Sequence, residues 1–300
     1  MFIIKYRKVW FALSAILIAA SIWSIFAYGF KLSIDFKGGT LTELSFEQRL
    51  YQTEIESKLS KLDLGSYSIR PSGEKNYVIR TRELNQAEKK LLTESVGGVT
   101  ERQNTVGPTV GAELQSKALK AIVVVVMMIV LFITFAFRKV SASLSRGIRG
   151  VSSWKYGLAT IIALAHDVII PAGIFVYLGH EIDLLFVTGL LAILGYSVHD
   201  TIVVFDRVRE NLRINQEQNR DEDFEVTVGK SVNQTFTRSI NTSVTIFITL
   251  LALYIFGSAA TQTFSLLLII GLIAGTYSSI FVASPLLVTF YKLQRKRAQV

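Results

Sequence analysis

The hydrophobic residues of this chain are gathered in six runs, each close to the length of about 20 residues that crosses a bilayer. The first run is longer than the apolar core of about 7–15 residues that is typical of a signal peptide, and no Ala-x-Ala-like cleavage site follows it. The pattern therefore predicts a polytopic membrane protein with six transmembrane helices. The runs are 9–27, 118–137, 156–177, 183–205, 233–256 and 264–291.

The segment between the first two runs is polar and mixes two periodicities. Several short stretches alternate like strands, and two have the 3–4-residue spacing of helices. The second helical stretch has Asn85 where an N-cap belongs and Glu88 three positions later. This order predicts a small α+β domain. The expected strands are 40–46, 67–70, 77–81 and a last piece after Gly97-Gly98, and the expected helices are 54–62 and 85–94.

Lysine and arginine are concentrated on one side of the predicted spans. They are frequent at the N-terminus, in the loops 138–155 and 206–232 and in the tail, whereas the turns 179–182 and 257–263 have none. The positive-inside rule then predicts that both termini are cytoplasmic. This topology accounts for the net charge of +9 without nucleic-acid binding. The expected parts are 1–28 (cytoplasmic N-terminus and first span), 29–117 (α+β domain on the opposite side of the membrane), 118–291 (the other five spans) and 292–300 (basic cytoplasmic tail).

Residue types and spacings argue against an enzyme. The chain has no cysteine, which excludes disulfides, thiolate metal sites and a cysteine nucleophile. No H-E-x-x-H spacing, phosphate-binding loop, nucleophile elbow or paired-carboxylate site is present. We therefore expect no catalytic residue, no cofactor and no metal.

Charged residues inside the spans are the strongest functional signal, because such residues are rare in lipid. Asp200 lies about 9 Å inside the cytoplasmic end of the fourth run at 1.5 Å per residue. Arg238 lies at a similar depth in the fifth run, so the two could pair. Burial and a nearby arginine act in opposite directions on the proton affinity of a carboxylate. Two arrangements of one pair would thus suit a proton-driven cycle, while a structural salt bridge remains the alternative.

Other polar residues in the spans support these two. In the third run, Asp167 is a second candidate relay group, next to His166 and four residues before Pro171, which can kink the helix. In the fifth run a polar stripe follows helical spacing; helix packing explains its threonines but not its arginine. The stripe consists of Gln234, Thr235, Arg238, Asn241, Thr242, Thr245 and Thr249.

Five stretches of the chain form a recognisable set: Asp35-Phe-Lys-Gly-Gly-Thr40, Val106-Gly-Pro-Thr-Val-Gly-Ala-Glu113, Ala165-His-Asp-Val168, Gly195–Asn211 and Gln234–Ser243. Together they resemble one known family, the SecF subunits of the bacterial SecD–SecF accessory complex of the protein-export channel. The resemblance implies membership of the resistance-nodulation-division superfamily, with six spans forming half of a unit completed by SecD. It also implies a ferredoxin-like periplasmic domain and the use of the proton motive force to pull preproteins outward.

The resemblance also implies roles for individual residues. Two charged positions of the family's proposed proton pathway match Asp200 and Arg238. The family usually has asparagine where this chain has His199, so this imidazole joins Asp167 as a further proton-pathway candidate. The candidates for coupling or structural roles are Asp35, Gly38, Gly39, Asp206 and Arg207.

The resulting hypothesis is a non-enzymatic subunit of a proton-driven export complex in the bacterial inner membrane. The partners implied by the resemblance are SecD, the SecYEG translocon, preproteins and lipid, with YajC as an additional candidate and no nucleic acid. Two alternatives are a small-molecule or lipid exporter subunit of the same superfamily and a structural assembly factor. The external domain is small for an exporter, and an ion pair that only fixes packing would survive double neutralisation.

Overall fold

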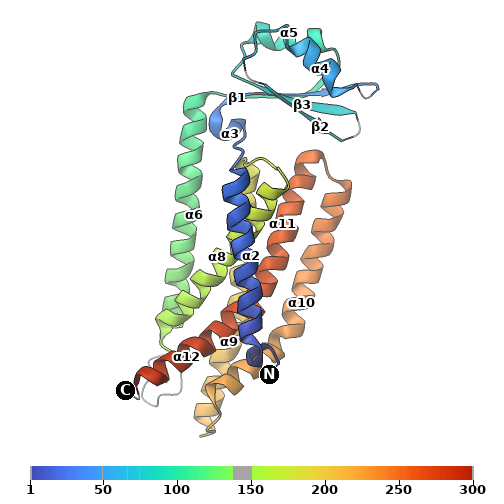
Figure 1. Ribbon diagram of the computed structural model, residues 1–300. Helices are drawn as coiled ribbons and strands as arrows, with labels where there is room; N and C mark the ends of the chain where they lie inside the picture. The colour runs from blue at the N-terminus through green and yellow to red at the C-terminus, as the bar shows by residue number, and fades with distance from the viewer. Residues whose placement is uncertain (1, 49, 66, 74, 138–150, 299–300) are drawn as a thin grey trace. The chain divides into compact units, whose positions relative to one another are not determined.

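The computed structural model describes residues 2–48, 50–65, 67–73, 75–137 and 151–298 (Figure 1). Most basic residues of the predicted loop 138–155 lie outside these residues. The chain divides into two units. One contains Met1–Gly29, Ile122–His180 and Phe186–Val300, and the other contains Phe30–Ala121 and Glu181–Leu185.

Six helical segments are long and apolar enough to cross a membrane, which confirms the predicted membrane fold. The last of them passes from α11 through a single π-helical turn into α12 without leaving the helical path. The short α1 (Phe2–Lys5) precedes them. The segments are α2 (Arg7–Tyr28), α6 (Pro108–Ala136), α8 (Ser153–Tyr177), α9 (Leu184–Glu217), α10 (Phe224–Phe256) and α11 (Ala259–Ser278) with η2 (Ser279–Ala283) and α12 (Ser284–Ala298).

The charged loop predicted at 206–232 is wrong, because α9 and α10 both continue into it and leave only residues 218–223 as the connection. The two helices are joined by side-chain hydrogen bonds along this stretch. Asn211 donates to Ser231 at 2.8 Å, and Asn215 donates to Thr227 at 3.1 Å. Charge therefore marked where the apolar run ends and not where the helix ends. The helix α11 likewise begins inside the predicted turn 257–263.

The helical unit is built around α8 and α11, whose side chains are the most buried of the spans. Within this unit α2 packs on α8, and α11 packs on both α8 and α10. Stacked rings of Phe137 and Tyr156, 4.9 Å apart, meet Phe205 of α9 edge-on. The outer helices α2, α6 and α10 instead expose many apolar side chains, as expected of surfaces that face lipid.

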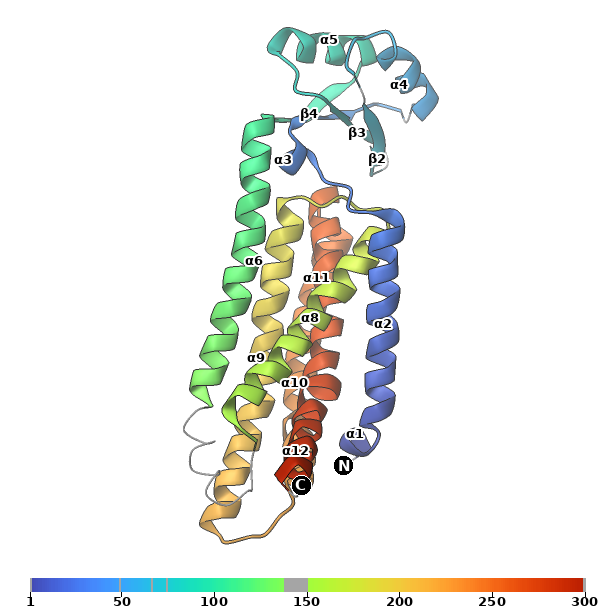
Figure 2. The same cartoon turned by 60° about the vertical axis from the view of Figure 1, so that its left-hand side comes forward.

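The second unit, the four-stranded domain, contains an antiparallel sheet of four strands in the order β2-β3-β1-β4. Together with α4 and α5 it gives the βαββαβ order of the ferredoxin-like fold, which the family resemblance implies, and it confirms the small α+β domain predicted from the pattern. Both helices lie on the same face of the sheet (Figure 2), and Leu44, Ile55 and Leu92 are fully buried between them and the sheet. The elements are α3 (Ile34–Lys37), β1 (Gly39–Ser45), α4 (Gln52–Leu59), β2 (Ser68–Ser72), β3 (Asn76–Thr81), α5 (Gln86–Val96) and β4 (Val99–Val106).

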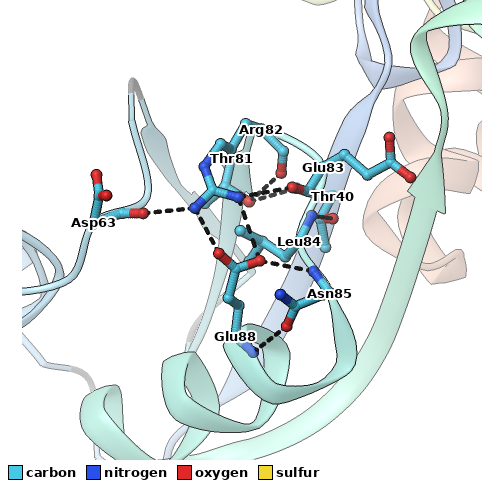
Figure 3. Close-up of polar contacts among 8 residues, drawn as sticks. All are labelled: Thr40, Asp63, Thr81, Arg82, Glu83, Leu84, Asn85 and Glu88. Carbon is cyan, nitrogen blue, oxygen red and sulfur yellow. Dashed lines mark hydrogen bonds and ion pairs between the residues drawn. The ribbon is translucent and has the colours of Figure 1, made fainter.

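The predicted cap of α5 is present in full (Figure 3). The Asn85 side chain accepts from the Glu88 backbone N–H at 2.9 Å, and the Glu88 carboxylate accepts from the Asn85 N–H at 2.8 Å. Arg82 donates to the other Glu88 oxygen at 2.6 Å and to the Asp63 carbonyl at 2.8 Å. The Arg82 hydrogen bond, with the bond from the Asn85 backbone, lowers the pKa of Glu88.

Candidate functional site

The carboxylate of Asp167 is fully buried and joins three helices. One oxygen lies 2.9 Å from Nδ1 of His166, its neighbour on α8. The other accepts hydrogen bonds from Ser278 of α11 at 2.8 Å and from Ser197 of α9. Helix α8 runs through Pro171 without interruption. Because both oxygens have partners, this carboxylate is a closed polar centre between helices.

The imidazole of His166 is buried with Asp167 and stacks on the Tyr277 ring at 5.7 Å. Its Nε2 has no hydrogen-bond partner among the described residues. The sequence placed this histidine only as a neighbour of Asp167, whereas the structure makes it a direct contact of the carboxylate.

The carboxylate of Asp200 has a different environment. One oxygen accepts a hydrogen bond from Ser239 of α10 at 2.5 Å. The other is shielded from solvent and forms no hydrogen bond of normal geometry within the described part of the chain, although the Ser279 hydroxyl lies near enough to interact with the carboxylate. An unpartnered buried polar atom is costly and calls for an explanation, such as water or a changing partner. Only one carboxylate oxygen of Asp200 is therefore hydrogen-bonded, whereas both oxygens of Asp167 are.

A cavity of about 50 Å³ opens beside Asp200 between α9, α10 and α11. About 10–15 Å³ of such volume holds one water molecule, so the cavity has room for a short chain of waters. Its lining includes both His199 and Arg238. Across the described residues, the Asp200 carboxylate forms no ion pair with an arginine or lysine, and Arg238 interacts with it only through space. The structure thus brings Asp200 and Arg238 to one cavity without forming the ion pair.

The polar stripe on α10 is mostly turned outward. The hydroxyls of Thr242 and Thr245 each donate to the carbonyl one turn earlier, at 2.9 Å, and that of Thr249 does so at 3.2 Å. Such back-bonding satisfies a threonine without a partner helix. The side chain of Arg238 remains as the exposed charge of the stripe beside the cavity.

Asp206 and Arg207 lie on the exposed part of α9 and contact neighbours there. Asp206 pairs with Arg209 at 2.7 Å on the same helix. Arg207 donates to Gln234 of α10 at 2.7 Å and pairs with Glu210 at 2.6 Å. These contacts stabilise the α9–α10 hairpin and do not reach Asp200.

The paired glycines Gly38 and Gly39 are required by conformation and by space. Their φ angles are +77° and +132°, a region that residues with a Cβ rarely adopt. A Cβ on Gly38 would lie 2.8 Å from backbone atoms of Pro108, and one on Gly39 would lie 2.5 Å from the Thr81 carbonyl oxygen. Asp35, three residues earlier, accepts a hydrogen bond from the Leu184 N–H at 3.1 Å.

The residues that sequence reasoning missed are the hydroxyl donors on the two carboxylates. Ser197, Ser239 and Ser278 look like ordinary small residues of membrane helices, which are common wherever helices pack closely. Sequence spacing gave no signal for these contacts, because each serine donates to an aspartate on a different helix. No group of three histidine, aspartate or glutamate side chains suited to a metal occurs among the described residues.

Comparison with known proteins gives concordant results. The chain matches the model of the protein export membrane protein SecD/SecF C-terminal family over residues 87–146 and 150–293, and that of the SecD/SecF GG motif over residues 23–48. It is 39% identical to protein translocase subunit SecF of Thermobaculum terrenum, over 96% of this chain and 93% of the relative. It is 36% identical to the subunit of the same name from Haemophilus influenzae, over 93% of this chain and 82% of the relative.

A solved structure agrees with these matches. The crystal structure of SecDF, a translocon-associated membrane protein from Thermus thermophilus, superposes with a TM-score of 0.83 at 31% sequence identity. The match covers 96% of this chain but only 38% of the SecDF chain. The GG motif corresponds to the Gly38-Gly39 turn, and the longer family match contains both carboxylate centres. The chain therefore belongs to the SecD/SecF family of protein-export membrane proteins, among its SecF subunits.

Proposed function

We propose that this protein is the SecF subunit of a complex that uses the proton motive force to promote preprotein translocation through the Sec channel. Asp200 is the proton acceptor, Arg238 is its switching partner, His199 tunes the cavity, and Asp167 supports the site from α8. The protein performs no catalysis of its own. SecD completes the membrane unit, and the SecYEG translocon, preproteins and YajC are its further partners.

The unpartnered oxygen of Asp200 is the observation that carries this proposal. A purely structural carboxylate in a membrane helix would be expected to have its partners in place, as Asp167 does. Asp200 instead has one free oxygen beside a cavity that also contains a guanidinium and room for water. A carboxylate in this setting can take up a proton when Arg238 is distant and release it when Arg238 approaches.

The topology of the proposal follows the distribution of basic residues. Both termini lie in the cytoplasm and the four-stranded domain lies in the periplasm. This places the α9–α10 connection in the cytoplasm and the α8–α9 connection in the periplasm. Reporter fusions to the C-terminus and to the four-stranded domain test this orientation directly.

The decisive test is pulse-chase export of a secreted protein in cells that carry Asp200→Asn, with membrane abundance measured in parallel. Asp206→Asn is the matched control, because it removes a carboxylate from the exposed part of the same helix. We expect Asp200→Asn to slow export at normal abundance and Asp206→Asn to leave it unchanged. Normal export by an abundant Asp200→Asn variant would exclude the proton-carrier role.

A double variant separates the proton carrier from a structural pair. Asp200→Asn with Arg238→Gln removes both charges while keeping polar side chains. A structural role tolerates this double neutralisation, because no charge is left uncompensated. A proton carrier does not, so the double variant should export as slowly as Asp200→Asn alone.

A further inference from the structure

The connection between α8 and α9 belongs to the same compact unit as the four-stranded domain. Residues Glu181–Leu185 are grouped with Phe30–Ala121, although most of the two membrane helices on either side of them are not. Backbone hydrogen bonds attach the α8–α9 connection to the segment that precedes α3. The Ile182 N–H donates to the Lys31 carbonyl at 2.8 Å, and the Ser33 N–H donates to the Ile182 carbonyl at 2.9 Å. This forms a parallel bridge between Leu32 and Ile182.

The Glu181 side chain adds charged contacts with two strands. Its carboxylate pairs with Arg80 of β3 and, at 3.3 Å, with Arg70 of β2. Burial lowers the pKa of the Arg80 guanidinium, and the adjacent Glu181 carboxylate partly offsets this effect. Nε of Arg80 and the second Glu181 oxygen are buried without hydrogen-bond partners among the described residues. Little water is thus available to either charge, and removal of one would leave the other poorly compensated.

Asp35 holds the beginning of α9. Leu184 is the first residue of this helix, and its N–H has no partner within the helix. Asp35 accepts a hydrogen bond from this N–H at 3.1 Å and places a negative charge at the helix N-terminus, where it is favourable. Asp35 lies three residues before Gly38, so the first N–H of α9 and the Gly38-Gly39 turn are contacted by one short segment.

The four-stranded domain is linked to the membrane helices in two ways, through the covalent chain and through non-covalent contacts. Helix α2 leads into it and α6 leads out of it through the peptide chain, whereas the α8–α9 connection is attached only by non-covalent contacts. A displacement of α9 can therefore reach the domain directly only while these contacts hold. Helix α9 is uninterrupted from Leu184 to Glu217 and carries Asp200.

We propose that these contacts form a clamp that transmits the state of α9 to the four-stranded domain, with Glu181 and Asp35 as positioning residues of the transport cycle. The clamp consists of the Glu181–Arg80–Arg70 cluster, the Leu32–Ile182 bridge and the Asp35–Leu184 hydrogen bond. This inference rests on the proposed function, because it requires that protonation changes at Asp200 alter α9. All residues of the clamp belong to this chain.

The first test compares Glu181→Gln with Glu88→Gln. Glu88 forms another arginine–glutamate pair in the same domain, 2.6 Å from Arg82, and does not contact the clamp. We expect Glu181→Gln to slow pulse-chase export several-fold at normal membrane abundance and Glu88→Gln to export as the wild type does. An abundant Glu181→Gln variant with wild-type export would overturn the inference.

A second readout separates transmission from structure. Dissipating the proton motive force should slow export in wild-type and Glu88→Gln cells more than in cells that lack the chain, because these two proteins still couple the force to export. Cells with Glu181→Gln should respond only as much as cells that lack the chain. A full response of slow Glu181→Gln cells would mean that the clamp is not in the path from protons to export.

Restoring the link covalently makes the test independent of folding losses. The chain has no cysteine, so Leu32→Cys with Ile182→Cys introduces a single disulfide at bridged backbone positions. In the Glu181→Gln background, oxidation should restore export and a reductant should abolish the gain in the same protein population. Equal rates in both redox states would overturn the inference.

The outcomes also distinguish this inference from the proposed function. Slow export by Asp200→Asn with wild-type export by Glu181→Gln refutes the clamp and leaves the proton-acceptor role in place. Wild-type export by Asp200→Asn refutes the proposed function itself.

Discussion

Replacing Gly173 with alanine is a sharp test of how the helical unit is packed. An added Cβ would lie 2.3 Å from the Cβ of Ser21 and 2.5 Å from its Cα, so α8 meets the backbone of α2 at this point. Ordinary contacts require about 3.4–4 Å, and a backbone cannot rotate away as a side chain can. The buried hydrogen bond from Ser24 to the Gly173 carbonyl, 2.9 Å long, depends on the same approach. Small residues at such crossings are what allow membrane helices to pack.

The expected loss combines three effects. Forcing a methyl group into a packed contact costs about 1–3 kcal/mol, and weakening the Ser24 hydrogen bond costs about 0.5–1.5 kcal/mol. Alanine recovers about 1 kcal/mol over glycine within a helix. The net destabilisation is about 0.5–3.5 kcal/mol, which for a chain of 300 residues corresponds to a fall in Tm of roughly 1–6 °C.

Gly195→Ala is the control, because Gly195 also lies in a membrane helix but has nothing within 4 Å of the added Cβ. Thermal unfolding of both purified variants in the same lipid nanodiscs measures the difference. The Tm of Gly195→Ala should equal or slightly exceed that of the wild type. A Gly173→Ala variant as stable as Gly195→Ala would refute the close approach of α2 and α8.

Three further predictions concern the four-stranded domain. Asn85→Ala removes the α5 cap and should destabilise that helix by about 1 kcal/mol, seen as faster hydrogen exchange of its amides. The pKa of Glu88 is lowered in the folded state, so its contribution is present above the unfolded value of 4.5 and is lost as the pH falls through the folded value. Amide protection of α5 should accordingly decrease in acid, and Glu88→Gln should remove this decrease; an unchanged pH profile would contradict the assignment. Gly39→Ala should lower membrane abundance through its clash with Thr81, whereas Gly73→Ala, also at positive φ but with nothing within 4 Å, should be much milder; equal losses would show that only φ matters.

Periodic features were predictable because they reflect local physics. Six apolar runs, the capping box of Asn85 and Glu88 and the order of strands and helices in a small α+β domain all follow from spacing and residue type, whereas the ferredoxin-like fold was implied by the family resemblance. The ends of the helices were harder to predict from the sequence. The run 183–205 ends where lipid-compatible residues end, but α9 continues to Glu217 because polar side chains such as Asn211 bond to α10. Strand β2 likewise continues through Pro71, which an edge strand tolerates because its outer N–H needs no partner.

Long-range polar contacts were the least predictable part. Glu181 is a single acidic residue in a tight turn. Nothing local indicates that Arg70 and Arg80, both more than 100 positions earlier, would pair with it. The serine hydroxyls that bond to the aspartates are equally hard to predict, because they too come from distant parts of the chain. Sequence reasoning found the residues whose type is costly in lipid, Asp167 and Asp200, but not the inexpensive residues that complete their surroundings.

The difference between these two aspartates limits what each can do. Asp167 has both oxygens occupied by His166, Ser197 and Ser278, so a change in its protonation would disturb three helices at once. Asp200 has one oxygen on Ser239 and one without a partner, so its partner can change at far smaller cost. Ser197 lies one turn before Asp200 on α9, and the hydrogen bond from Ser197 to Asp167 therefore fixes the rotation of the helix that carries Asp200. We therefore propose that Asp167 is the fixed polar contact of the site and that Asp200 is the group whose protonation changes.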